Sequence, residues 1–131
     1  MDFLPYLYQM DGTIRKEIFI ADDDQVFLQA IEARLTQAGY LVNSALDGQI
    51  ALVKLRTKKY DLLLLDIMMP YYSGVEILSE IKALYPDVPV IIISALEAQE
   101  LIFTAFEIGA NEFILKPVNL DELLLRIEKF I

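Results

Sequence analysis

Ile-Phe-Ile-Ala-Asp-Asp-Asp, at residues 18–24, is the stretch of sequence that decides the fold. Its four apolar residues predict a short buried strand, and three aspartates follow where that strand ends. A second segment, Asp-Leu-Leu-Leu-Leu at residues 61–65, leads in the same way into Asp66. Apolar residues at adjacent positions are typical of strands covered on both faces, so these segments predict a parallel sheet between two layers of helices.

Strand-like and helix-like patterns alternate on either side of these segments. Short apolar runs predict strands at residues 18–21, 40–45, 61–65, 88–93 and 112–115. Helical spacing predicts helices at residues 25–38, 48–59, 75–84, 98–108 and 120–130, with Asp24 and Asn119 as N-caps. Because crossovers between parallel strands are right-handed, this order predicts an α/β fold, a doubly wound (βα)5 five-stranded parallel sheet.

The composition limits the chemistry. The chain has 131 residues, which suits one domain, and 56% of them are hydrophobic. It contains neither histidine nor cysteine, which excludes Ser-His-Asp and Cys-His catalysis, phosphohistidine chemistry on this chain, thiolate metal sites and disulfides. Any chemistry therefore has to come from carboxylates, lysine, hydroxyl groups and the backbone.

Charge and hydropathy exclude two classes of partner. The formal net charge is −9 and the sequence pI is about 4.4, so the field of the chain repels nucleic acid. No apolar run approaches the roughly 18 residues that span a bilayer. The N-terminal segment is apolar but short, and it lacks the basic flank of a signal peptide. We expect a cytoplasmic protein that binds neither nucleic acid nor a membrane.

Polar side chains follow four of the five predicted strands. They are Asp22, Asp23 and Asp24 after the first, Asp66 after the third, Ser94 after the fourth and Lys116 after the fifth. In a doubly wound sheet the ligand site lies beyond these carboxyl ends. Clustered aspartates repel one another, and Mg²⁺, which prefers hard oxygen ligands, relieves that repulsion. Carboxylate, cation, lysine and hydroxyl are the parts of a phosphoryl-transfer site.

Each residue also has a plainer explanation. An aspartate after a strand often only caps the next helix or is solvated, and Asp24 is expected to act as a cap. The phosphoryl-transfer interpretation depends on Asp66 occurring together with Ser94 and Lys116 at separate strand ends.

Four motifs, in this order and at these spacings, resemble the response-regulator receiver domains of two-component signalling. They are residues 18–24, Leu-Leu-Leu-Leu-Asp-Ile-Met-Met-Pro at 62–70, Ile-Ile-Ile-Ser-Ala at 91–95 and Gly-Ala-Asn-Glu-Phe-Ile-Leu-Lys-Pro at 109–117. The resemblance covers residues 17–131 and implies the flavodoxin-like strand order 2-1-3-4-5. Residues 1–16 remain as an N-terminal extension. Two alternatives stay open for it: a disordered terminus, or packing of its apolar residues on the domain or on another chain, namely Phe3, Leu4, Tyr6, Leu7, Tyr8 and Met10.

The resemblance also implies an acceptor and a metal site. Asp66 would take a phosphoryl group from a sensor histidine kinase or a histidine phosphotransfer protein. Mg²⁺ would be bound by Asp66, by Asp23 directly, by Asp22 through water and by the backbone carbonyl of Met68. Such a domain catalyses its own phosphorylation and slow hydrolysis, and is not an enzyme acting on an external metabolite.

The same resemblance implies how the signal is read. Ser94 and Lys116 would hold the phosphoryl oxygens, Phe113 would be the switch aromatic, and the bond from Lys116 to Pro117 would be cis. The sequence departs from the family at residues 71–72, where two tyrosines replace small or acidic residues. The plainer expectation is a partly exposed loop, and the alternative is that these rings narrow access to the site or contact a partner.

Two other functions compete with this interpretation, the first of them on the same fold. A phosphorylation-independent interaction module usually lacks an acidic residue, the hydroxyl or the lysine, all of which are present here. An aspartate-nucleophile phosphatase generally needs a second aspartate two residues after the nucleophile, where this chain has Met68. The sequence names neither the kinase nor the output, and it leaves open whether the chain stands alone or belongs to a longer protein.

The helix predicted at residues 98–108 is apolar nearly all round. Its spacing predicts that Phe103 and Phe106 face the sheet, while Leu101, Ala105 and Ile108 lie on the opposite side. In the family, the fourth helix, fifth strand and fifth helix form the usual output surface. Charged residues resembling those of dimeric regulators occur there, namely Glu112, Glu122 and Arg126, but Ile102 replaces a basic residue. We therefore expect an apolar contact, with either a second copy or an effector protein.

Overall fold

Five parallel strands form one sheet in the structure, a computed structural model that describes residues 7–9 and 12–131. The strands are β1 (Glu17–Ala21), β2 (Leu41–Ala45), β3 (Leu62–Asp66), β4 (Val90–Ser94) and β5 (Glu112–Leu115), in the order β2-β1-β3-β4-β5. The helices are α2 (Gln25–Gln37), α3 (Gly48–Thr57), α4 (Gly74–Leu84), α5 (Gln99–Ile108) and α6 (Leu120–Glu128). The predicted doubly wound fold and strand order are confirmed, and each element ends within about two residues of its predicted bounds.

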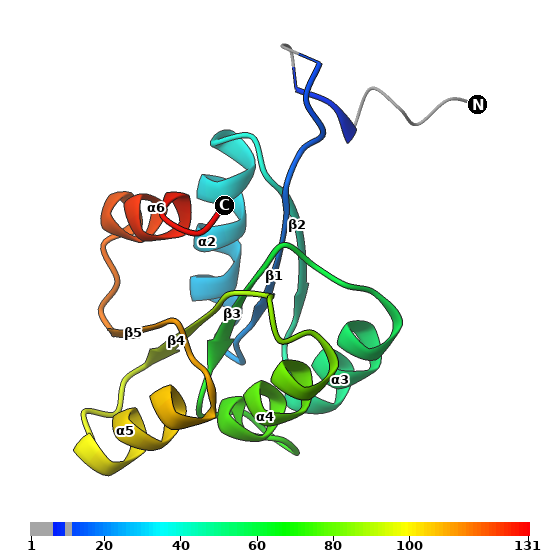
Figure 1. Ribbon diagram of the computed structural model, residues 1–131. Helices are drawn as coiled ribbons and strands as arrows, with labels where there is room; N and C mark the ends of the chain where they lie inside the picture. Colours follow the sequence, from blue (N-terminus) through cyan, green and yellow to red (C-terminus); the bar gives the residue numbers. More distant parts are fainter. Residues whose placement is uncertain (1–6, 10–11) are drawn as a thin grey trace.

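Helices cover both faces of the sheet (Figure 1). The leucines of β3 alternate between the two faces, as successive side chains of a strand must. Leu62 and Leu64 pack in the core cluster that α2 and α6 cover, while Leu63 and Leu65 pack in the cluster that α3, α4 and α5 cover. Every residue of β3 and β4 is buried, whereas β2 and β5, at the two edges, are mostly half-buried.

The register of the central strands brings their carboxyl ends to the same edge of the sheet. Ala21, the last residue of β1, is paired with Leu65 on β3, so the residues that follow Ala21 lie beside Asp66. On its other side, Asp66 is paired with Ile93 of β4. The strand pairing alone therefore fixes where the polar side chains after these strands can lie.

Side-chain caps mark where four of the helices begin. The carboxylates of Asp24 and Asp47 and the amide oxygen of Asn119 each accept a backbone N–H of the first turn. Ser73 and Glu76 form a reciprocal capping box at the start of α4. The predicted caps of α2 and α6 are thus confirmed. Helix α5 begins after Ala98, which provides no side-chain hydrogen bond.

The predicted orientation of α5 is wrong. Ala105 is fully buried, and Leu101 and Ile108 pack against the core. Phe103 and Phe106, expected to face the sheet, are 64% and 47% exposed. Both sides of this helix are apolar, so the spacing could not decide between them. Burying the side that carries the small Ala105 lets the helix lie close to the sheet, which a phenylalanine at its centre would prevent.

The described part of the extension turns back on itself beyond the amino end of β1 (Figure 1). Tyr8 and Ile14 form an antiparallel bridge, and the Arg15 guanidinium donates to the Gly39 carbonyl at 3.2 Å. Leu7 and Tyr8 are exposed on this chain. The other apolar residues of the extension lie outside the described residues: Phe3, Leu4, Tyr6 and Met10.

Within residues 7–9 and 12–131, no helix combines the length and apolarity needed to cross a bilayer.

The first prediction concerns Gly74, which holds the loop after β3 against the strand. Its N–H donates to the Ile67 carbonyl at 3.0 Å, and a Cβ at this position would overlap the backbone carbonyl of Asp66. Gly74→Ala should therefore lower the free energy of unfolding by about 3 kcal/mol, measured by urea denaturation. Gly39→Ala is the control, because open space surrounds Gly39 and only its φ of 101° is unfavourable for alanine. We expect a loss of about 1 kcal/mol there, and equal losses would contradict the steric argument.

Candidate phosphoryl-acceptor site

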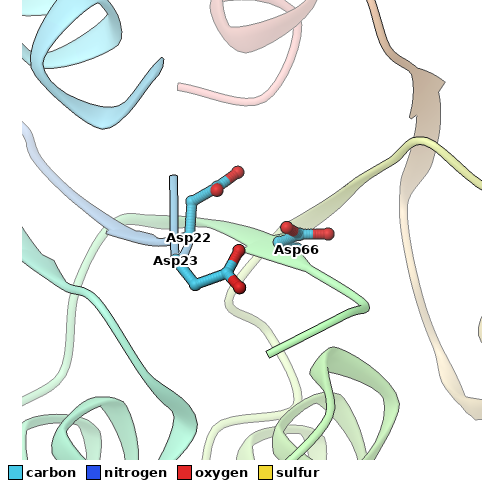
Figure 2. A group of neighbouring side chains, drawn as sticks. All are labelled: Asp22, Asp23 and Asp66. Carbon is cyan, nitrogen blue, oxygen red and sulfur yellow. The ribbon is translucent and has the colours of Figure 1, made fainter. Parts of the chain in front are cut away.

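Three aspartates from two neighbouring strands lie together at the carboxyl edge of the sheet (Figure 2). Asp22 and Asp23 follow β1, and Asp66 is the last residue of β3. One carboxylate oxygen of each lies within 4.8 Å of the oxygens of the other two. Asp22 and Asp66 are buried, and Asp23 is exposed. The structure therefore brings together the three side chains that the sequence predicted as metal ligands.

The Lys116 ammonium contacts both buried carboxylates. Its Nζ lies 2.9 Å from Asp22 Oδ2 and 3.4 Å from Asp66 Oδ2. The backbone helps to place it, because the Lys116 N–H donates to the Ser94 carbonyl at 2.8 Å. The peptide bond between Lys116 and Pro117 is cis, as predicted. The lysine at the end of β5 thus reaches the aspartates at the ends of β1 and β3.

The other oxygens of the buried aspartates accept backbone hydrogen bonds. Asp66 Oδ1 accepts from the Met68 N–H at 3.2 Å, and Asp22 Oδ1 accepts from the Asp24 N–H at 2.9 Å. Each donor lies two residues after its acceptor, so the loop that leaves the strand also orients the carboxylate. The described residues include no buried side-chain nitrogen or oxygen without a hydrogen-bond partner.

Negative charge nevertheless exceeds positive charge at the site. Burial raises the pKa of the Asp66 carboxyl and the charge of Asp22 raises it further, while the Met68 N–H and Lys116 offset only part of this rise. Burial lowers the pKa of Lys116, but its hydrogen bond to Asp22 and the charges of both aspartates outweigh burial, so the lysine stays protonated. One ammonium faces three carboxylates, and their hard oxygen atoms fit a divalent cation such as Mg²⁺.

Ser94 and Phe113 lie in the strands next to this cluster. Ser94 ends β4, is fully buried, and accepts the Leu96 N–H on its Oγ at 3.0 Å. Phe113 lies on β5, opposite Ile92, and is half-buried against the core cluster that α5 covers. Ser94 thus ends the strand next to β3, as the sequence predicted, whereas Phe113 lies within β5.

Exposed apolar residues stand two positions after Asp66 and two positions after Ser94. Met68 and Leu96 are 58% and 41% exposed, and each donates its backbone N–H to a residue of the site. A hollow of about 340 Å³ beside the cluster is lined by Asp23 and by loop residues after β3: Ile67, Met68, Met69, Pro70 and Ser73. Space next to the carboxylates is thus open to the surface.

The two tyrosines after β3 lie in the loop that leads to α4. Tyr71 is 74% exposed and has a φ of 73°, a left-handed conformation uncommon for residues other than glycine, asparagine and aspartate. The Tyr72 N–H donates to the Pro70 carbonyl at 2.9 Å, and the Tyr72 backbone packs directly against Gly48. The loop is therefore fixed on α3 while one ring points outward.

Sequence reasoning missed one residue of the site. Phe27, in the first turn of α2, has its ring under the Lys116 ammonium, with Nζ 4.5 Å from the ring centroid. In the sequence Phe27 is one apolar residue of a helical pattern, and no signal distinguishes it from an ordinary core residue.

Comparison with known proteins agrees with this geometry. The profile of the family described as "Response regulator receiver domain" matches residues 18–128. The chain belongs to this family, and it is a receiver domain of the kind found in two-component response regulators.

The curated relatives are regulators. The transcriptional regulatory protein CrdR of Helicobacter pylori is 35% identical over 118 residues, which cover 89% of this chain and 55% of CrdR. Response regulator RR06 of Streptococcus pneumoniae is 40% identical over 114 residues, covering 87% of this chain and 52% of RR06. The chain thus spans about half the length of these curated relatives.

Solved receiver domains share the fold along most of their length. A CheY-like receiver domain protein from Methanospirillum hungatei superposes with a TM-score of 0.85 at 31% identity, covering 88% of this chain and 92% of that one. The BeF3-activated receiver domain of DrrB gives a TM-score of 0.83 at 32% identity, with coverages of 89% and 97%.

Proposed function

We propose that Asp66 accepts a phosphoryl group and that the domain thereby relays a two-component signal. The observation that carries this proposal is the setting of the Asp66 carboxylate. It is buried at a strand end, with Lys116 at one oxygen and the Met68 N–H at the other, and two further carboxylates lie beside it. An oriented carboxylate among cation-binding groups is the nucleophile that phosphoryl transfer requires.

The reaction exchanges one phosphorus bond for another. An oxygen of Asp66 attacks phosphorus, the bond from phosphorus to the leaving group breaks, and an aspartyl phosphate forms. Because the chain contains no histidine, a phosphohistidine donor has to come from a partner, which we propose is a sensor histidine kinase or a histidine phosphotransfer protein. The leaving group is then the imidazole of that partner.

The surrounding residues compensate the charge of the phosphoryl group. Mg²⁺, bound by Asp22, Asp23, Asp66 and the Met68 carbonyl, would neutralise phosphoryl oxygens during the transfer. The Lys116 ammonium, already beside Asp66, would pair with a phosphoryl oxygen once the carboxylate is phosphorylated. The Ser94 hydroxyl, at the end of the adjacent strand, would donate to another, and Phe113 would follow that movement by burial alone, since it has no hydroxyl.

We also propose that residues 17–131 are the signalling unit and residues 1–16 a separate extension. The family match begins at residue 18. Before β1, the described part of the chain forms its own antiparallel turn between Tyr8 and Ile14. Nothing in the proposed chemistry uses a residue of this segment.

The second prediction tests the phosphoacceptor. With Mg²⁺ and acetyl phosphate, the chain should gain one phosphoryl group, measured by intact mass, and the modification should be lost in base. Asp66→Asn should abolish the gain, because an amide is not a nucleophile. Asp87→Asn is the matched control, because Asp87 is exposed and pairs with Lys59 at 2.9 Å, away from the site. Labelling that persists in Asp66→Asn would refute the assignment, and labelling without Mg²⁺ would refute the role of the metal.

The third prediction concerns how long the phosphoryl group persists. Hydrolysis needs a water aligned opposite the aspartyl oxygen, and neither Met68 nor Leu96 can orient one. The aspartyl phosphate should therefore be long-lived for this family. Met68→Asn and Leu96→Glu should each shorten its lifetime by about tenfold, followed by the decay of intact-mass labelling after the donor is removed.

The control for these variants is Leu84→Glu, a leucine at the end of α4 whose exposure, 50%, lies between those of Leu96 and Met68. It should leave the lifetime unchanged. Unchanged lifetimes in both Met68→Asn and Leu96→Glu would contradict the hypothesis.

The output surface is proposed to be the exposed side of α5. Phe103 and Phe106 provide two large apolar side chains there. The spacing had instead predicted Leu101, Ala105 and Ile108 on the exposed side. Arg126 of α6 pairs with Glu112 and Glu122 of the same chain, so these charged groups already have partners. We propose an apolar contact with a second copy or an effector protein, strengthened by phosphorylation.

The fourth prediction tests this surface in its homodimeric form. The double variant Phe103→Glu, Phe106→Glu should take up phosphoryl groups normally and lose self-association, because charges replace the apolar contact. Sedimentation before and after treatment with acetyl phosphate measures it, with Ile50→Glu, Val53→Glu on the exposed side of α3 as control. A wild-type monomer in both states would contradict the homodimer.

A further inference from the structure

The Lys116 ammonium is enclosed by an aromatic ring as well as by carboxylates. Asp22 and Asp66 contact Nζ at 2.9 Å and 3.4 Å, and the Phe27 ring centroid lies 4.5 Å from it. The face of an aromatic ring is negative, so it attracts a cation placed over it. The lysine side chain is only 22% exposed, which strengthens this attraction because little water competes.

The ring is fixed in place by α2. The Phe27 N–H donates to the capping Asp24 carboxylate at 3.1 Å, and the side chain packs against the core cluster beneath α2 and α6. Phe27 therefore provides a fixed aromatic surface against which the Lys116 ammonium lies.

The position of the lysine opposes binding of a metal. Asp22 and Asp66 are two of the three carboxylates that could hold a divalent ion, and the ammonium contacts both. Like charges repel, so a divalent cation bound by these carboxylates would displace the ammonium from Asp22. Any interaction that stabilises the ammonium in this position therefore lowers the affinity of the carboxylates for the metal.

We propose that Phe27 is a positioning residue whose ring holds the Lys116 ammonium against Asp22 and Asp66 in the metal-free site and thereby weakens Mg²⁺ binding. This inference rests on the proposed function, because it takes the three carboxylates as the Mg²⁺ site. It assigns to α2 a part in setting the Mg²⁺ concentration at which the domain becomes competent to accept a phosphoryl group.

Calorimetric titration of the unphosphorylated protein with Mg²⁺ tests the proposal. Phe27→Leu removes the ring and keeps an apolar side chain, and it should bind Mg²⁺ about twofold to tenfold more tightly. Phe27→Tyr keeps the ring and should match the wild type. Phe130→Leu is the matched control, because Phe130 packs against the same core cluster and lies over no lysine in the structure; it should also match the wild type.

A double-mutant cycle separates the proposed coupling from a general effect on packing. In a Lys116→Met background the ammonium is absent, so Phe27→Leu should no longer change the affinity for Mg²⁺. An effect of the same size in both backgrounds would overturn the proposal, as would unchanged affinity in Phe27→Leu alone. A wild-type protein that binds no Mg²⁺ would instead refute the metal site of the proposed function.

Nuclear magnetic resonance gives a readout that holds even if Lys116→Met fails to fold. The Lys116 methylene protons next to Nζ should be shifted upfield by the Phe27 ring in the metal-free wild type. They should move towards ordinary lysine values in Phe27→Leu and on addition of Mg²⁺ to the wild type. Ordinary values in the metal-free wild type would overturn the proposal.

Discussion

Repulsion among the carboxylates at the ends of β1 and β3 is the constraint on which the site depends. The register of the two strands places Asp22 beside Asp66, and both strands are held at the centre of the sheet by buried side chains on each face. The aspartates therefore cannot move apart to relieve the repulsion. Lys116 and two backbone N–H groups compensate part of the charge, and the raised pKa of the Asp66 carboxyl reflects burial and the charge that remains.

The sheet supplies the stability that such a site requires. Strand β3 is flanked by β1 and β4, and its alternating leucines enter both core clusters, so a shift of Asp66 would disturb both sides of the domain. Gly74 then brings the next loop into contact with the Asp66 backbone. By contrast, β2 lies at an edge of the sheet and its carboxyl end provides no reactive side chain.

Most of this arrangement could be predicted because it depends on backbone patterns. Strands apolar on both faces specify a parallel sheet, and a parallel sheet brings all strand ends to one edge, which is why Asp66 and Lys116 could be placed together. Two features depend on side-chain packing and could not be predicted. Both sides of α5 are apolar, so the burial of Ala105 instead of Phe103 was not evident, and the contact of Phe27 with Lys116 exists only once α2 and β5 are in place.

Helix α5, which is proposed to carry the output surface, is also the helix with the fewest buried residues. Ala105 is the only residue of α5 that is buried, whereas every other named helix buries at least three residues of its own. Helix α5 also begins without a side-chain cap, and its connection to β4 starts at Ser94, whose hydroxyl accepts the Leu96 N–H. A helix with little buried contact and an uncapped first turn needs little free energy to be displaced. A change in the hydrogen bonding of Ser94 would therefore alter the position of α5 before that of any better-packed helix, and the exposed phenylalanines would move with it.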